Sequence, residues 1–316
     1  MPATCAISLP RRRAAPWVGR RTRRQATGEV QMYAVSGVTG HTGRIAAETL
    51  LAGGAPVRVL VRDEAQGAPW RARGAEVAVA DLWDGDALTR ALTGVAGAYL
   101  LSPPRLAAAD PLAEATRLGQ AFAHALREAH VPHVVLLSSV GSQHAAGTGP
   151  IRTTHGLEGL LDEVGVPRTY VRAASFLENW GAVVAPAKSD GVLPTFIPAD
   201  KRYAQVSVRD IGRVAAEALL QGPSGRRVIE LAGPRDLTAE DVAATLGGLL
   251  GRPVRAHAYP AAAAAQVYQG YGMSPGAASL MAEMYAGIES GVVSFEGTPV
   301  RGLVTAEDVL RALIAA

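Results

Sequence analysis

The feature that most constrains the fold is a glycine-rich loop, GVTGHTG, between an apolar run and an amphipathic segment. Gly37, Gly40 and Gly43 follow the run MYAVSG (32–37) and open the segment TGRIAAETLLAGG. Glycines at this spacing permit a tight turn, close approach of backbone N–H groups to a pyrophosphate, and close packing of helix on strand. The helix N-terminus also favours an anion. In this setting the loop predicts a dinucleotide-binding site rather than a structural turn alone, made by Gly37, Thr39, Gly40, His41, Thr42 and Gly43.

From Met32 onward, short apolar runs alternate with amphipathic stretches, as in the strand–helix–strand units of a parallel sheet. The clearest helix has Asp110 as its N-cap and Pro111 in its first turn. The pattern predicts an α/β fold with a doubly wound parallel sheet (Rossmann). Its strands are expected at 32–37, 56–61, 75–80, 96–101, 133–139 and 168–173.

After about residue 180 the pattern loosens into turn-rich segments, followed by a strand–helix piece at 204–220, a strand at 226–231 and Ala-rich helices. We expect a dinucleotide-binding domain over 32–180. The remainder, 181–316, is expected to form a smaller C-terminal substrate lobe whose pieces interleave with the last elements of the sheet. Asp210 is expected to cap a helix beginning at Ile211.

The formal net charge of +3 is unevenly placed along the chain. Residues 1–31 hold seven arginines and one acid, a net of +6, whereas the 24 basic and 27 acidic residues from Met32 onward give −3. Capture of phosphates needs a basic stripe on a folded surface, so we expect no nucleic-acid partner. No apolar stretch approaches the ~18 residues of a membrane span, so we expect no membrane partner either.

The basic leader, residues 1–31, has three interpretations: a disordered arm, an organellar transit segment, or upstream sequence that is not native. The last is favoured because Met32 is followed at once by a strand and the glycine loop. The one cysteine, Cys5, also lies in the leader. A chain without a disulfide framework is typical of a reducing, cytoplasmic setting.

The end of the second predicted strand bears on the choice of nicotinamide cofactor. An acid there binds the ribose 2′-hydroxyl, and a base accommodates a 2′-phosphate. The chain places Arg62 at the strand end and Asp63 next. NADPH is therefore favoured, and NADH remains possible if the two residues form only a solvated pair at a helix start.

Polar residues also follow the third, fourth and fifth predicted strands, at the edge where doubly wound sheets bind ligands. Asp81 either accepts a hydrogen bond from the adenine amino group or caps the helix of residues 85–92. The other candidates at this edge are Ser102, Pro103, Pro104, Ser138 and Ser139.

Several kinds of catalytic machinery do not match the sequence. Typical short-chain dehydrogenases place a tyrosine four residues before a lysine on a helix, so that the ammonium lowers the pKa of the phenol. The two lysines here, Lys188 and Lys201, have no tyrosine at that spacing. The histidines lack paired metal spacing and no GxSxG motif occurs, so we expect neither a metal site nor acyl transfer.

The GxTGxTG loop, Arg62 and the Ser138–Ser139 pair together resemble the atypical short-chain dehydrogenases. The resemblance is to the NmrA-like NAD(P)-binding family with its quinone oxidoreductase branch. It runs from about Met32 to the C-terminus through the segments HVVLLSSVGS, LEGLLDEVGVPRTYVRAASFLENW and VSVRDIGRVAAEAL. The chain departs from the family pattern at Ala173, where members often carry proline, and at Thr154, where many carry lysine.

The resemblance implies that the glycine loop and Arg62 hold the dinucleotide and that the residues after the fourth and fifth strands flank the nicotinamide. It also implies that Phe176, Asn179 and Trp180 wall the substrate pocket. Packing at the join of the two lobes is the alternative for Phe176 and Trp180.

Two functions fit these residues. The first is an NADPH-dependent oxidoreductase that transfers a hydride to a quinone or other small electrophilic carbonyl, with Ser139, His155 and Asn179 as hydrogen-bond donors. The second is a non-catalytic NAD(P) sensor that reports cofactor state to a protein partner. The pocket-like residues at 176–180 favour the enzyme. Because such folds often pair through helices, a homodimer is also open.

Overall fold

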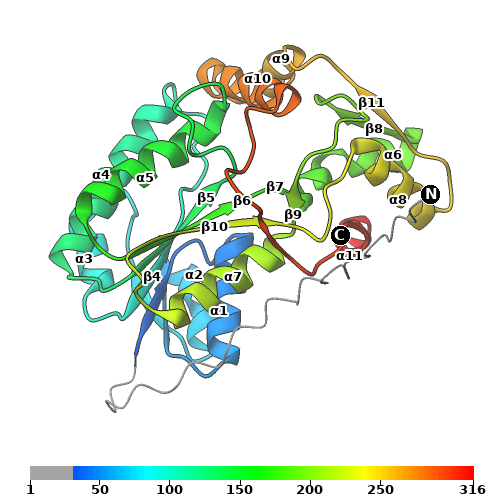
Figure 1. The fold of residues 1–316 in the computed structure, drawn as a ribbon. Helices are drawn as coiled ribbons and strands as arrows, with labels where there is room; N and C mark the ends of the chain where they lie inside the picture. The colour runs from blue at the N-terminus through cyan, green and yellow to red at the C-terminus, as the bar shows by residue number, and fades with distance from the viewer. Residues whose placement is uncertain (1–30) are drawn as a thin grey trace, which may run out of the picture.

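The computed structural model describes residues 31–316, and a parallel sheet lies at its centre (Figure 1). Eight strands run in the order β12-β10-β6-β5-β4-β1-β2-β3. The predictions for the leader, including Cys5, fall on residues 1–30, outside the described part of the chain.

All six strands expected from the sequence are present and paired in parallel. The order β3-β2-β1-β4-β5-β6 confirms the doubly wound sheet. Two strands from the second half of the chain, β10 (Arg226–Ala232) and β12 (Val300–Arg301), extend it beyond β6. The six are β1 (Tyr33–Val35), β2 (Val57–Val61), β3 (Glu76–Val79), β4 (Gly97–Leu100), β5 (Val134–Ser139) and β6 (Arg168–Ala173).

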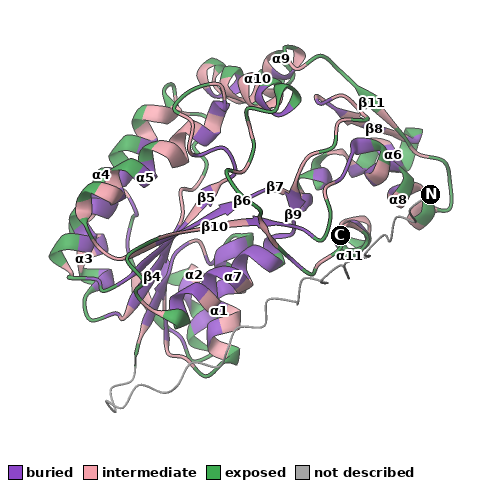
Figure 2. Ribbon diagram, viewed as in Figure 1, coloured by how far each residue is buried: buried purple, intermediate pink, exposed green. Residues whose placement is uncertain are grey.

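Helices cover both faces of the sheet, because successive residues of each strand point to opposite faces and both sets are apolar. Val35, Val59 and Tyr99 face α1 (His41–Ala52), α2 (Glu64–Arg71) and α7 (Val208–Gln221). Ala34 and Leu60 face α3 (Gly85–Leu92), α4 (Pro111–Glu128) and α5 (Arg152–Val164). Figure 2 shows the strands buried between these two layers.

Helix α4 begins as the sequence predicts. The Asp110 carboxylate accepts hydrogen bonds from the backbone N–H groups of Leu112 and Ala113, both at 3.0 Å. Leu118 and Phe122, on the face of α4 that contacts the sheet, are fully buried.

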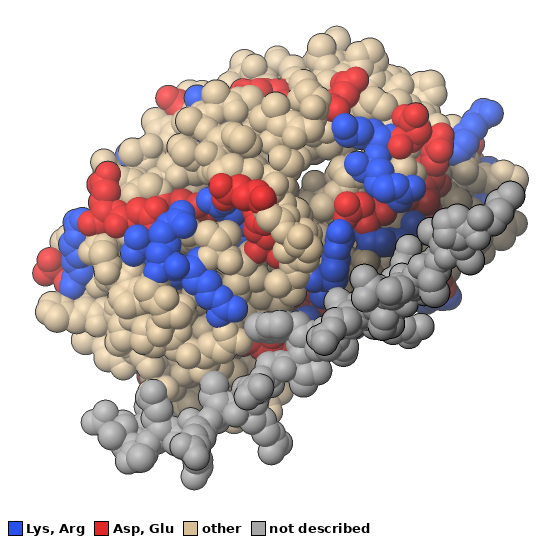
Figure 3. All heavy atoms as spheres, viewed as in Figure 1, with Lys and Arg blue, Asp and Glu red and all other residues tan. Residues whose placement is uncertain are grey.

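A smaller lobe has its own core, with Leu177, Trp180, Leu193, Val242 and Leu310 among its buried side chains. An opening separates this lobe from the helices above the sheet (Figure 3). The lobe comprises β7 (Ser175–Phe176), η2 (Leu177–Val183), α6 (Val184–Asp190), β8 (Val192–Thr195), β9 (Gln205–Val206), α8 (Ala239–Leu250), β11 (Arg255–Ala258) and α11 (Ala306–Ala315).

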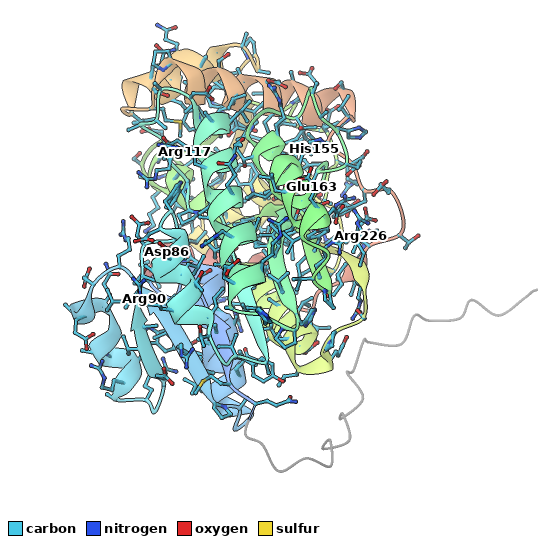
Figure 4. All side chains as sticks on the ribbon, turned by 90° about the vertical axis from the view of Figure 1, so that its left-hand side faces the viewer. Asp86, Arg90, Arg117, His155, Glu163 and Arg226 are labelled. Atoms are coloured by element: carbon cyan, nitrogen blue, oxygen red, sulfur yellow. The ribbon has the colours of Figure 1, made fainter. Side chains whose placement is uncertain are left out.

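Helices α9 (Ala263–Gly270) and α10 (Pro275–Ser290) lie across one end of α4 and α5 (Figures 1 and 4). Helix α10 touches the loop after β5 backbone to backbone. A Cβ on Gly149, whose φ is +60°, would lie 2.0 Å from the Leu280 carbonyl oxygen, so only glycine fits there. The Glu283 carboxylate also accepts a hydrogen bond from the Gly147 N–H at 2.8 Å. Helix α10 is thus fastened over the carboxyl edge of the sheet.

Within residues 31–316, no helix combines the length and the apolar composition that crossing a bilayer requires.

The predicted cap of one helix is wrong, and the capping alternative for Asp81 is also wrong. Helix α7 begins three residues earlier than expected, and Ser207 caps it by accepting a hydrogen bond from the Arg209 N–H at 3.2 Å. Asp210 is instead buried in the first turn, where it accepts hydrogen bonds from the N–H groups of Leu303 and Val304. Helix α3 is capped by Asp84, because that residue, and not Asp81, directly precedes the first turn.

Candidate active site

The glycine loop forms a turn that requires glycine at two positions, Gly37 and Gly43. Gly37 has a φ of +68°, which favours glycine. A Cβ on Gly43 would lie 2.3 Å from the Ser36 carbonyl oxygen, so helix α1 packs directly on the backbone that follows β1. A Cβ on Gly40 would meet only the Gly37 oxygen, at 3.4 Å, and otherwise project into open space. The loop therefore presents backbone, not side chains, at Gly40.

The N-terminus of α1 is open to an anion. Its N-cap is Gly40, and no side chain caps the helix. The first N–H groups of a helix have no partner within it and carry the positive end of its dipole. Thr39, Gly40 and His41 are exposed beside them. This geometry suits a phosphate or pyrophosphate group.

Thr42 differs from its neighbours because its side chain is buried. Its hydroxyl accepts a hydrogen bond from the Tyr99 hydroxyl at 3.1 Å, which ties α1 to β4. Burial raises the pKa of the Tyr99 phenol, so the donor stays protonated. The Thr42 side chain is thus part of the packing of the loop.

Arg62 lies exposed at the end of β2, and the acids beside it are engaged elsewhere. Asp63 caps α2, accepting a hydrogen bond from the Gln66 N–H at 2.9 Å, and Glu64 pairs with Arg71. Asp81, exposed after β3, accepts a hydrogen bond from the Trp83 N–H at 3.0 Å. Because β3, β2 and β1 are neighbours, Asp81, Arg62 and the glycine loop follow one another along the same edge of the sheet.

The two serines that end β5 point to opposite faces of the sheet. The Ser138 hydroxyl is buried and donates to a Glu158 oxygen at 2.5 Å, and Glu158 in turn is paired with Arg172. The Ser139 side chain is half-buried and donates to the Val140 carbonyl oxygen at 3.2 Å. Of the two hydroxyls, that of Ser139 is the one at the open edge.

His155 and Thr154 meet the turn after β5 at Ser142. The Nδ1 atom of His155 lies 2.8 Å from the Ser142 carbonyl oxygen. Because a carbonyl oxygen only accepts, Nδ1 carries a proton and Nε2 is left for a ligand. Thr154, in the place of the family lysine, has its hydroxyl 2.6 Å from the Ser142 hydroxyl. In Figure 4, His155 lies at the end of α5 that faces α10.

The three residues expected to wall a substrate pocket differ in how far they are buried. Asn179 is exposed, and Phe176 is half-buried in β7 at the edge of the sheet core. Trp180 is buried in the core of the smaller lobe, where its Nε1–H donates to the Gln205 side-chain oxygen at 2.7 Å. Trp180 therefore packs inside the smaller lobe, and not at the join of the two lobes.

A cavity of about 170 Å³ adjoins the end of β4 and contains residues that sequence reasoning missed. Ser102 and Pro103 line it, as expected for residues at this edge. Its other wall is α10, through Leu280 and Met281. Leu280 follows Ser102 by 178 residues along the chain, and nothing in the local sequence of its helix indicates that it covers this edge. Only the tertiary fold brings the two together.

Comparison with known proteins places these observations in a family. A model of the NmrA-like family matches residues 30–292. An NAD(P)H azoreductase of Xenophilus azovorans is 29% identical over 259 residues, covering 81% of this chain and 86% of the relative. A (4-alkanoyl-5-oxo-2,5-dihydrofuran-3-yl)methyl phosphate reductase of Streptomyces griseus subsp. griseus is 32% identical over 225 residues, covering 71% and 76%.

Among solved structures, the chain is similar to an NADPH-dependent quinone oxidoreductase of Escherichia coli complexed with NADPH. The two share 24% identity with a TM-score of 0.78, over 90% of this chain and 100% of the other. At this identity the likeness supports the fold.

Proposed function

The chain belongs to the NmrA-like family, and on that premise we propose that it is an NADPH-dependent oxidoreductase acting on a quinone or another small electrophilic acceptor. The relatives named above include reductases that use NAD(P)H or NADPH. The observation that carries the proposal is the alignment of the uncapped α1 N-terminus, the side-chain-free surface at Gly40 and the exposed Arg62 along one edge of the sheet.

The residues at this edge fit a dinucleotide. The backbone of Gly37 to Gly43 would hold the pyrophosphate, and Arg62 would pair with the 2′-phosphate. Asp81 would accept from the adenine, and Ser102 and Pro103 would flank the nicotinamide. Ser138 contributes by holding the end of β5 through Glu158. When bound, NADPH supplies a hydride.

The acceptor would lie next to Ser139 and His155. Both side chains present hydrogen-bonding groups at the end of β5, and the Ser142 carbonyl fixes the orientation of the imidazole. They would bind an oxygen of the acceptor as negative charge develops there. Reduction of a quinone by a hydride also takes up one proton, which a protonated His155 delivers from Nε2 and solvent then replaces. Phe176 and Asn179 would limit the acceptor on the side of the smaller lobe.

The test is to measure NADPH oxidation with a panel of quinones and aldehydes, beside NADPH binding, for the full chain and for the variants His155→Gln and Ser139→Ala. We expect each variant to lower kcat by about tenfold or more while the Kd for NADPH is unchanged. His124→Gln, an exposed histidine on α4, is the matched control. NADPH binding without turnover of any acceptor would instead support the sensor function.

A further inference from the structure

Four aromatic side chains from four segments gather where α9 and α10 approach the smaller lobe. The Phe196 ring, just after β8, lies 5.3 Å from the Tyr285 ring of α10 and 6.1 Å from the Tyr268 ring of α9, centroid to centroid. Tyr259, after β11, is 6.2 Å from Phe196 on another side. The chain has only four phenylalanines and eight tyrosines, so this cluster holds a large share of them.

Two tyrosine hydroxyls in the cluster are hydrogen-bonded to each other, and one of their two hydroxyl protons is left without an acceptor. The Tyr268 and Tyr285 hydroxyl oxygens are 2.6 Å apart, and their rings are stacked. One hydroxyl donates to the other, which uses one of the two protons. Neither oxygen has another hydrogen-bond partner among residues 31–316. The second proton is therefore available to a ligand.

The surroundings of Tyr285 keep its phenol in the neutral, donating form. Burial raises the pKa of the Tyr285 phenol, and the neighbouring Tyr268 and Tyr203 phenols raise it further. Burial also raises the pKa of Tyr203. Among residues 31–316, no carboxylate is hydrogen-bonded to either hydroxyl.

Helix α10 connects the cluster with the cavity beside the candidate active site. Met281, which lines that cavity with Ser102 and Pro103, is one helical turn before Tyr285 and on the same face of α10. The opposite side is the smaller lobe, where Phe196 is half-buried. Figure 3 shows the opening between α10 and this lobe. An acceptor at the end of β5 can thus extend toward the cluster.

We propose that the Tyr268–Tyr285 pair donates a hydrogen bond to the far oxygen of a planar aromatic acceptor whose ring packs against Phe196. This inference rests on the proposed function and assigns its substrate class: fused-ring quinones and similar planar aromatic acceptors, rather than small aliphatic carbonyls. A flat ring and a terminal oxygen match the two things that the cluster offers, an aromatic face and an O–H donor.

The experiment compares the single variants Tyr268→Phe and Tyr285→Phe with the double variant, using NADPH and a 1,4-naphthoquinone. Each single variant retains one hydroxyl with a free proton, so we expect little change in the KM for the quinone. The double variant has no donor, and its KM is expected to rise about two- to tenfold. The Kd for NADPH and the KM for a small aliphatic dicarbonyl are expected to stay unchanged. Tyr271→Phe is the matched control, because Tyr271 follows α9 and is 82% exposed.

A pair that only fastens α9 to α10 would behave differently. Either single variant would break the one hydrogen bond, so the melting temperature would fall in both singles and little further in the double, with no change in the KM for the quinone. That result, or equal KM values in all four proteins, would overturn the inference. Failure of the proposed function itself is distinguishable, because the unaltered protein would then turn over no acceptor at all.

Discussion

The guanidinium of Arg172 meets the carboxylate of Glu158 through two hydrogen bonds, Nε to Oε1 at 2.9 Å and Nη2 to Oε2 at 2.7 Å. Both side chains are almost completely buried, at 4% and 5% exposure. Glu158 lies on α5 and Arg172 on β6, and the Ser138 hydroxyl at the end of β5 donates to the same carboxylate. This buried group thus joins three elements beneath the candidate active site.

Replacing Glu158 with glutamine should destabilise the fold, because it leaves the Arg172 charge buried with a weaker partner. Breaking a buried ion pair on one side typically costs about 3–5 kcal/mol, and the loss here should fall at or below the lower end, because Glu296 still pairs with Arg172. Chemical denaturation measures this loss. Arg311→Ala is the control: its partner Glu307 is on the same helix and both are exposed, so a change within about 0.5 kcal/mol is expected. Equally small losses of unfolding free energy in Glu158→Gln and Arg311→Ala would show that the buried ion pair does not stabilise the fold.

The glycine loop gives a second prediction, in which two substitutions separate folding from binding. Gly40→Ala should leave stability nearly unchanged, because its methyl group meets only one oxygen at 3.4 Å, but should weaken NADPH binding about tenfold or more by blocking the approach to the backbone. Gly43→Ala should lower both stability and binding, because its methyl group would lie 2.3 Å from a carbonyl oxygen.

The control for these variants is Gly159→Ala on α5, where an added Cβ would touch nothing within 4 Å. It should leave NADPH binding unchanged and stabilise the helix by up to about 1 kcal/mol. Normal affinity in Gly40→Ala would argue against a cofactor in this loop.

Arg62 gives a third prediction, about the choice of cofactor. Arg62→Ala should raise the Kd for NADPH by about tenfold or more and leave the Kd for NADH nearly unchanged, since only NADPH carries the 2′-phosphate. Titration of both dinucleotides measures the ratio. Arg71→Ala removes an exposed arginine of α2 that pairs with Glu64, and should alter neither Kd. Equal losses for the two cofactors in Arg62→Ala would refute the assigned role.

His133 gives a fourth prediction, on stability and pH. The side chain is buried just before β5, with Nε2 3.1 Å from the Thr169 hydroxyl. Burial, together with the nearby Arg227, lowers the pKa of His133 to about 4. In the unfolded chain the pKa of histidine is about 6.5, so the unfolded state binds more protons between these values. The free energy of unfolding should therefore fall by about 3 kcal/mol as the pH falls from 6.5 to 4.

His133→Gln should flatten this pH dependence, because glutamine does not titrate. Denaturation at several pH values would measure it for the unaltered protein, for this variant and for the exposed-histidine control His124→Gln, which should keep the slope. An unchanged slope in His133→Gln would assign the acid sensitivity to other groups.

The sequence was sufficient for the first six strands of the sheet, because each of them carries its own signal, but it did not predict β12. Apolar runs bounded by turns locate β1 to β6, and the residues just after them fall at one edge, where Arg62 and Asp81 are found. Helix caps were less certain, since a serine and an aspartate compete within a few residues, as Ser207 and Asp210 show.

The sequence did not predict contacts between residues that are far apart along the chain. The pairing of Glu158 with Arg172 depends on how α5 packs on β6, and the placement of α10 over Gly149 depends on the fold of the whole chain. The sequence also could not predict that Trp180 is buried in the smaller lobe. An aromatic residue near a predicted site can line a pocket or pack in a core, and the two look the same in the sequence.

The proposed function requires that the protein, loaded with NADPH, reduces an acceptor at the carboxyl edge of its sheet. The most direct test is a single turnover: the full chain is saturated with NADPH, mixed with a 1,4-naphthoquinone, and the absorbance of the reduced nicotinamide is followed. We expect bound NADPH to be oxidised in equal amount to the quinone reduced, and to be oxidised more slowly in His155→Gln. Tightly bound NADPH that stays reduced with every quinone and aldehyde offered would contradict the claim.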